Sequence, residues 1–333
     1  MSKVVPDHKV VPDHKVVPDH KVVPDHKVYA DHKVYADLKR LVEMQLHAKE
    51  VEFLPKQVMH SVLVGQHGSR LRGRGLSFEE LRAYRVGDDI RTLDWKVTNR
   101  TRKPHVRVYT EERERDVIIL VDQRSHMFFG SQVQMKSVTA ADVAALAVWR
   151  MLSLNDRVGA LVFNDKSIAK IKPQRSRKTA MQILQSIVQM NHQLAAKQSN
   201  QNAMQLDHVL HQAERLCGHD CMLILISDLN GWNQQCLERV KRLKAHNDLI
   251  VSFVVDPLEQ SLPQHKQLVI SDGDLQICVD TELDNLKNKF DETFSARIDS
   301  LRSELSEYTV PMSLVDTITP AYQQLHRLGV ANE

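Results

Sequence analysis

The last two-thirds of the chain alternate between short apolar runs and longer segments with helical periodicity. The apolar runs are rich in Val and Ile and occupy residues 117–121, 158–163, 222–226 and 249–255. Parallel strands that are covered on both faces have this nearly continuous apolar character. The helical segments between and after them span residues 136–152, 177–190, 204–216 and 234–246. This alternation predicts an α/β fold with a doubly wound, mostly parallel sheet, of the Rossmann-like kind.

The C-terminal part adds a hairpin and further elements of the same layer. Residues 267–270 and 275–279 flank the sequence Ser-Asp-Gly-Asp, which is typical of a tight hairpin turn. A helix over 282–305, a strand over 311–315 and a closing helix from Thr319 are expected to follow.

The N-terminal end has a different pattern. Its first 36 residues repeat the hexapeptide K-V-V-P-D-H, which drifts to K-V-Y-A-D-H. The period is too short for a helical stripe, and the prolines interrupt strand pairing, so we expect disorder there. The Asp-His pairs of the repeat suit weak transition-metal binding, although an expanded repeat without a site is the favoured interpretation. Helical spacing begins between Ala36 and Glu52. The predicted organisation is a repeat over 1–36, a helix and charged accessory module over 37–115, and the α/β domain over 116–333.

Composition narrows the class of protein. With 333 residues, 42% apolar and 26% charged, the chain can bury one large core and a smaller second unit. It contains no run of about 18 apolar residues and no N-terminal signal pattern, so we expect a soluble cytoplasmic protein. The four cysteines lack paired spacing and are interpreted as reduced thiols. A metal cluster of Cys217, His219 and Cys221 is disfavoured, because Cys221 opens an apolar strand.

Positive charge gathers before the α/β domain. Between His67 and Arg107 there are eleven Lys or Arg and five Asp or Glu, a surplus that would attract an anionic partner. Aromatic side chains are too few in this stretch to form a base-stacking platform. Pairing of the arginines with local carboxylates across a domain junction is therefore favoured, and nucleic-acid binding through residues 67–107 remains an alternative.

Three apolar runs end in an acid, at Asp122, Asp228 and Asp256. Ligands of open α/β sheets lie beyond the carboxyl ends of the strands, so these acids could hold a hard cation or a basic partner there. Capping of the following loop is an equal alternative for Asp256. A metal-dependent hydrolase at this edge remains a second alternative function. The chain has no phosphate-binding loop, no G-x-S-x-G elbow and no H-E-x-x-H motif.

The segment from Gly75 to Asp122 resembles the signature of the bacterial family called domain of unknown function 58. It contains the pattern Phe-x-x-Leu-Arg-x-Tyr-x-x-Gly-Asp-Asp-x-Arg-x-x-Asp-Trp. The matching positions are Phe78, Leu81, Arg82, Tyr84, Gly87, Asp88, Asp89, Arg91, Asp94 and Trp95. The resemblance implies a von Willebrand factor type A-like domain and a partnership with a MoxR-type AAA+ ATPase. It extends less sharply over residues 50–330.

The same resemblance implies which residues would hold a metal ion, and the sequence can be compared with that set. Type A domains hold Mg²⁺ with Asp-x-Ser-x-Ser after the first strand, a threonine on a second loop and an aspartate after the fourth strand. Asp122 and Asp228 fill the aspartate positions, but Arg124 and His126 replace the serines and Met204 offers no hydroxyl. We expect no tight Mg²⁺ binding, no other metal and no cofactor.

This comparison predicts a degenerate adhesion site that binds a protein partner. Its candidate residues are Asp122, Arg124, Ser125, His126 and Asp228. In one hypothesis Arg124, braced by Asp122 or Asp228, replaces the metal and receives a partner's carboxylate. In the other, Arg124 only forms an intramolecular salt bridge.

The signature residues are not expected to be catalytic. Carboxylates so close to Arg82, Arg85 and Arg91 should have depressed pKa values, which do not suit proton transfer at neutral pH. A structural role, clamping the accessory module to the sheet, is favoured over a binding site. The sequence as a whole predicts a non-enzymatic interaction module, an adaptor for an ATPase in protein maturation or remodelling. No membrane association is expected, and nucleic acid is a disfavoured partner.

Overall fold

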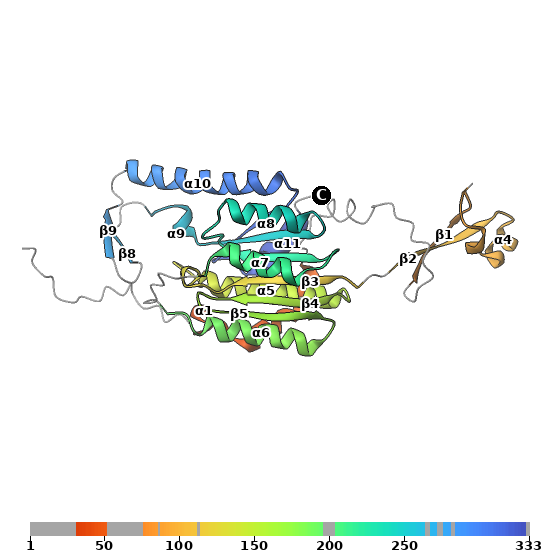
Figure 1. Ribbon diagram of the computed structural model, residues 1–333, viewed down its shortest axis with the longest axis horizontal. Helices are drawn as coiled ribbons and strands as arrows, with labels where there is room; N and C mark the ends of the chain where they lie inside the picture. The colour runs from red at the N-terminus through yellow and green to blue at the C-terminus, as the bar shows by residue number, and fades with distance from the viewer. Residues whose placement is uncertain are drawn as a thin grey trace, which may run out of the picture.

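The protein is built on a six-stranded sheet with the order β10-β7-β6-β3-β4-β5. Figure 1 labels β3, β4 and β5 of this sheet and the helices that cover it. The computed structural model describes residues 31–51, 76–85, 87–111, 114–195, 204–263, 267–271, 276–280 and 284–330. All neighbouring strands are parallel except β4 and β5. The strands are β3 (Asp116–Asp122), β4 (Arg157–Phe163), β5 (Ile168–Gln174), β6 (Met222–Ser227), β7 (Asp248–Val255) and β10 (Met312–Asp316).

Helices cover both faces of this sheet, which explains the continuous apolar runs. Ile119 and Val121 of β3 belong to one buried cluster, whereas Ile118 and Leu120 belong to the other. The first cluster includes α5 (Lys136–Ser153), α6 (Arg177–Asn191) and α11 (Ala321–Val330). The second includes α7 (Leu206–Leu216), α8 (Gln234–Lys244) and α10 (Asp284–Ser306). The predicted α/β class with a mostly parallel sheet is confirmed.

Strand β5 was missing from the predicted elements. It alternates half-buried and exposed residues, with Lys170 and Lys172 on its exposed positions. A charged edge strand lacks the apolar run that marks the central strands. The predicted hairpin is present as β8 (Gln267–Ser271) paired antiparallel with β9 (Gln276–Asp280).

Residues 31–51 pack on the α/β core and form what we call the N-terminal strap. The strap contains α1 (Asp31–Val34), α2 (Leu38–Glu43) and the 3₁₀ turns η1 (Met44–Leu46) and η2 (Ala48–Glu50). Its apolar side chains join the cluster of α5, α6 and α11. Trp149 Nε1 donates to the carbonyl of Leu41 at 3.0 Å, and the Tyr35 hydroxyl donates to the carbonyl of Leu194 at 3.2 Å.

The strap corrects two predicted boundaries. Residues 37–51 belong to the α/β unit and not to the accessory module, because Leu41, Ala48 and Val51 are buried in its core. Residues 31–36 were expected to be disordered with the repeat, but residues 31–34 form α1 and Ala36 is buried. The rest of the repeat lies outside the described residues.

A small unit, which we call the hairpin module, is inserted between the strap and β3. It pairs β1 (Leu76–Ala83) antiparallel with β2 (His105–Glu111), and between them lie η3 (Ile90–Thr92) and α4 (Trp95–Thr101). In Figure 1 it stands apart from the sheet, on the side where β3 begins. Among the helices that the structure describes, none combines the length and apolarity needed to cross a membrane.

Candidate functional site

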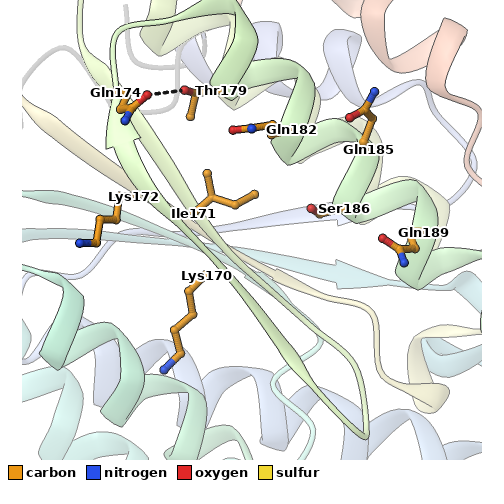
Figure 2. A pocket seen from close by; sticks show the side chains of 9 residues that line it. All are labelled: Lys170, Ile171, Lys172, Gln174, Thr179, Gln182, Gln185, Ser186 and Gln189. Carbon is orange, nitrogen blue, oxygen red and sulfur yellow. Dashed lines mark hydrogen bonds between the residues drawn. The ribbon is translucent and has the colours of Figure 1, made fainter.

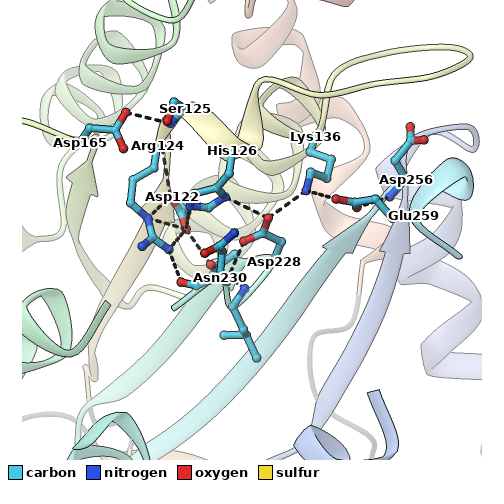
Figure 3. Close-up of polar contacts among 12 residues, drawn as sticks. Asp122, Arg124, Ser125, His126, Lys136, Asp165, Asp228, Asn230, Asp256 and Glu259 are labelled. Atoms are coloured by element: carbon cyan, nitrogen blue, oxygen red, sulfur yellow. Dashed lines mark hydrogen bonds and ion pairs between the residues drawn. The ribbon is translucent and has the colours of Figure 1, made fainter. Parts of the chain in front are cut away.

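The candidate site lies at the carboxyl edge of the sheet, where two central strands end side by side. β3 and β6 are adjacent and parallel, so Asp122 and Asp228 emerge at the same edge. The hydroxyl of Ser227 donates to Asp122 Oδ2 at 2.7 Å. The strand ends therefore bring the two predicted aspartates together, as Figure 3 shows.

The guanidinium of Arg124 joins three loops at this edge. Its Nε lies 3.0 Å from Asp122 Oδ1, and its Nη2 lies 2.6 Å from Asp122 Oδ2. Nη1 donates to the carbonyl of Met204 and Nη2 to that of Asn230, both at 3.1 Å. The Arg124 side chain is only 3% exposed. The guanidinium therefore has intramolecular partners on every nitrogen, and the geometry does not support its direct contact with a partner's carboxylate.

A second buried cation, Lys136, occupies the other side of the site. This residue belongs to the first turn of α5, and its ammonium lies 2.8 Å from Asp228 Oδ2 and 2.6 Å from Glu259 Oε1. His126 Nδ1 also lies 2.9 Å from Asp228 Oδ2. Because an ionised carboxylate can only accept a hydrogen bond, His126 carries a hydrogen on Nδ1 and donates it to Asp228. Asp228 is thus held between an imidazole and an ammonium (Figure 3).

Ser125 contributes its backbone rather than its hydroxyl to the described geometry. Its N–H donates to Asp165 Oδ2 at 2.9 Å, which ties the loop after β3 to the loop after β4. Sequence reasoning missed Asp165, Lys136 and Glu259 as site residues. Asp165 follows an apolar run and could have been found by the rule that located Asp122. Lys136 and Glu259 had no such signal, since only the fold brings α5 and the turn after β7 together.

The buried charges stabilise one another. Burial alone would raise the pKa of Asp122, but Arg124 and then His126 outweigh it and hold that pKa below its usual value. Burial opposes ionisation of Asp228 too, yet Lys136 and the hydrogen bond from His126 lower its pKa strongly. The pKa values of both cations are raised, because their carboxylate partners outweigh the effect of burial. All four groups are therefore charged at neutral pH.

The site does not fit the Mg²⁺ that the family resemblance implies. Asp122, His126 and Asp228 do offer ligand atoms within 4.8 Å of one another. However, both oxygens of Asp122 accept from Arg124, and Asp228 Oδ2 accepts from Lys136. A divalent ion would have to displace two fixed cations from the same oxygens. Together Arg124 and Lys136 carry the +2 charge that such an ion would supply.

Asp256, the third acid at a strand end, is a structural cap. It accepts from the backbone N–H of Leu258 at the start of α9 (Pro257–Gln260), in a capping box with Glu259. It also accepts from the backbone and hydroxyl of Ser131 and from the hydroxyl of Thr317 at 2.7 Å. The capping alternative is the one that the structure shows.

The signature carboxylates organise the hairpin module from inside. Asp88 receives both guanidinium nitrogens of Arg82 at 2.8 Å. Asp94 caps α4 through the N–H groups of Lys96 and Val97 and pairs with Arg107 at 2.8 Å. The first contact joins β1 to the turn that follows it, and the second joins the start of α4 to β2, whereas the sequence had suggested a clamp between the module and the sheet.

The other signature positions shape the turns or face solvent. Asp89 accepts from the backbone N–H of Arg91 at 3.0 Å, and the N–H of Tyr84 donates to the carbonyl of Pro104 at 2.9 Å. Gly87 has φ +108°, a conformation that side-chain-bearing residues rarely adopt. Trp95 is 65% exposed.

A recess of about 480 Å³ lies away from this site, between the edge strand β5 and helix α6. Figure 2 shows its amide-rich lining on α6 and the lysines of β5. It is lined by Lys170, Ile171, Lys172, Gln174, Thr179, Gln182, Gln185, Ser186 and Gln189. The carboxyl-edge site, by contrast, is filled by its own salt bridges.

Comparison with known structures gives distant similarities. Protein BatB from Bacteroides thetaiotaomicron is 16% identical, with a TM-score of 0.43 over 66% of this chain and 98% of that one. A von Willebrand factor type A protein from Catenulispora acidiphila is 11% identical, with a TM-score of 0.41 over 68% of this chain and 44% of that one.

Sequence comparison is more specific. The chain is 28% identical over 239 residues to the uncharacterized proteins Rv1480 of Mycobacterium tuberculosis and Mb1516 of Mycobacterium bovis. These alignments cover 71% of this chain and 73% of each relative. Residues 80–299 match the family model described as protein of unknown function DUF58. The chain belongs to the DUF58 family.

Proposed function

We propose that this protein is a non-enzymatic protein–protein interaction module that binds a partner through the loops at the carboxyl edge of its sheet. The observation that carries the proposal is the buried Arg124 guanidinium, which joins Asp122 to the carbonyls of Met204 and Asn230. In a metal-dependent type A domain the ion joins such loops. Here a side chain does so, and the loops are held in one arrangement without an added ligand.

The surface that these loops present suits protein binding. Phe129 is 37% exposed and lies beside the site, with the Lys136 ammonium 5.9 Å from its ring centroid. Asn230 is exposed on the neighbouring loop. An aromatic anchor on a rigid loop is a common hot spot of protein interfaces. The partner would contact these outer side chains and not the buried guanidinium.

The charges of the site argue against acid–base catalysis. A general base works best with a pKa near the operating pH. The pKa values of Asp122 and Asp228 lie below their usual range because Arg124 and Lys136 stabilise the ionised forms. The carboxylates are therefore structural acceptors, and the hydrolase alternative has the weaker support.

As the partner we propose a MoxR-type AAA+ ATPase, with this chain as its adaptor in protein maturation or remodelling in the cytoplasm. The support for the partner is the family resemblance of the signature. The three described cysteines Cys217, Cys221 and Cys236 are free thiols, which suits a reducing compartment.

Biolayer interferometry between the purified chain and the MoxR-type ATPase of the same genome tests the proposal. Phe129→Ala should weaken binding at least about tenfold, the effect of removing a hot-spot side chain. Leu154→Ala is the matched control, since Leu154 is exposed at the far end of α5. Equal affinity of wild type and Phe129→Ala would contradict the proposed surface. Hydrolysis of phosphatase or protease substrates that Asp228→Asn abolishes would instead support an enzyme.

A further inference from the structure

The hairpin module exposes large apolar side chains that the carboxyl-edge site does not use. Trp95 at the start of α4 is 65% exposed, and Ile90 in η3 is 63% exposed. Exposed apolar groups of this size in one small unit are typical of an interaction surface. Trp is also among the residues that contribute most to binding energy in interfaces.

The part of the module whose side chains the structure describes has very little core of its own. Of the described side chains in 81–85 and 87–107, only Asp94 and Val106 are buried. A two-stranded hairpin in water is marginally stable without packing against other elements. The ion pairs of Asp88 with Arg82 and of Asp94 with Arg107 hold its shape, but charged groups supply no apolar core. This imbalance indicates that the working form of the module is covered by another chain segment.

The uncovered surface is positively charged. Residues 81–107 contain eight Lys or Arg and three Asp. The three aspartates are engaged within the module, as ion-pair partners or as helix caps. Within the described part of the chain, Arg91 and Lys96 form no ion pair. A recess of about 310 Å³ brings these cations together with Trp95, and it is lined by Arg91, Thr92, Leu93, Asp94, Trp95, Lys96 and Arg107.

The positive charge of this surface distinguishes among the molecules that could bind it. A second copy of the module carries the same positive surplus and would be repelled. The preceding segment 52–75 has four Lys or Arg and one Glu, so it is not complementary either. A nucleic acid would satisfy the cations, but its phosphates would meet Asp94 in the recess, and one tryptophan is no platform for successive bases.

We infer that the hairpin module is a second docking surface, which binds an acidic segment of a partner protein whose apolar side chain covers Trp95. The surface lies at the end of the sheet opposite the carboxyl-edge site, because the module joins β3 at Asp116 and the site begins at Asp122. Those ends are roughly 20 Å apart, given about 3.3 Å per strand residue. The inference does not depend on the proposed ATPase.

Panning a random peptide library displayed on phage against the purified full chain tests the inference without a known partner. Parallel panning uses Trp95→Ala and Arg91→Glu/Lys96→Glu, with Lys172→Glu as a charge-reversal control on the distant strand β5. Far-ultraviolet circular dichroism and thermal melts check that each variant is folded. One enriched peptide and a random DNA duplex, each carrying a fluorescent label, are then titrated with every variant while fluorescence anisotropy is followed.

The wild type and Lys172→Glu should enrich peptides that combine acidic with aromatic or aliphatic residues, and both module variants should lose them. The enriched peptide should bind Trp95→Ala and the double charge reversal at least about tenfold more weakly, as expected for a hot-spot residue and its surrounding charges. Equal enrichment by all variants, or enrichment of basic peptides, would overturn the inference. DNA binding with a steep salt dependence and no acidic peptide would establish a nucleic-acid surface instead. Self-association that Trp95→Ala abolishes would assign the face to a second copy.

Discussion

The guanidinium of Arg124 lies against the carboxylate of Asp122, with Nη2 2.6 Å from Oδ2 in a fully buried pair. The two residues are two positions apart in sequence, so their contact lies within the loop after β3. Further donors of Arg124 reach the carbonyls of Met204 and Asn230. One side chain therefore joins the loop after β3 to the loop after β6 and to the residues before α7.

Removing this side chain should destabilise the protein strongly. Arg124→Ala leaves the buried Asp122 without its partner, and loss of one member of a buried pair costs about 3–5 kcal/mol. The stability of Arg124→Lys should fall between that of the wild type and that of Arg124→Ala, because an ammonium keeps the charge but cannot span the same acceptors. Urea unfolding measures both. Arg175→Ala is the control, since its exposed pair with Glu114 should contribute at most about 1 kcal/mol. A similar loss in Arg124→Ala and Arg175→Ala would contradict the geometry.

Restoring hydroxyl ligands should restore a metal response. In the variant Arg124→Ser/His126→Ser/Met204→Thr, the cation that competes for Asp122 is gone and oxygen ligands face the cleared position. Millimolar Mg²⁺ should then raise the melting temperature, whereas the wild type should not respond. Saturation at 100 times Kd would add about 2.7 kcal/mol.

The same triple variant carrying Asp122→Asn is the control for that experiment and should lose the response. A Mg²⁺-dependent shift in the wild type would mean that Arg124 does not exclude a cation.

The strap should respond to pH through Asp142. Burial raises the pKa of Asp142 from 3.8 to about 6, although Arg40 and Gln134 oppose the shift. The folded state therefore holds this proton more tightly than the unfolded state, and stability should fall as pH rises from about 4 to about 6. Asp142→Asn should flatten this part of the pH profile of the free energy of unfolding.

Arg40→Ala should show the complementary behaviour. Arg40 of the strap pairs with Asp142, so its removal leaves a buried carboxylate unpaired once that group ionises. The loss should be small at pH 5 and reach about 3 kcal/mol at pH 8. Equal losses at the two pH values would show that Arg40 acts through packing instead of charge.

The hairpin module should loosen independently of the core when Asp94 is replaced. Asp94→Ala removes the cap of α4 and the partner of Arg107, so the module should lose stability locally. Amide hydrogen exchange should accelerate in residues 94–107, while β3 and β6 keep their protection. Asp94→Asn keeps an acceptor for the cap and should give a smaller effect. Accelerated exchange throughout the sheet would show that the module and the core unfold together.

Some of the site followed from local patterns. Parallel strands that end in Asp122 and Asp228 had to place them at one edge, and the replacement of serines by Arg124 and His126 was visible in the loop sequence. The roles of Lys136 and Glu259 were not visible, because Lys136 contacts Asp228 across 92 residues of chain and Glu259 across 123. The choice between the two hypotheses for Arg124 needed its burial, which depends on the loops around it.

The sequence by itself determined the sheet and its covering helices, because strands buried on both faces must be apolar along their whole length and helices must repeat every 3.6 residues. Tertiary structure alone decided that the strap belongs to the α/β core, that the signature carboxylates pair inside the hairpin module, and that β5 closes one edge. Those outcomes depend on which surfaces meet, and surface contact between distant segments leaves no periodic signal in either partner.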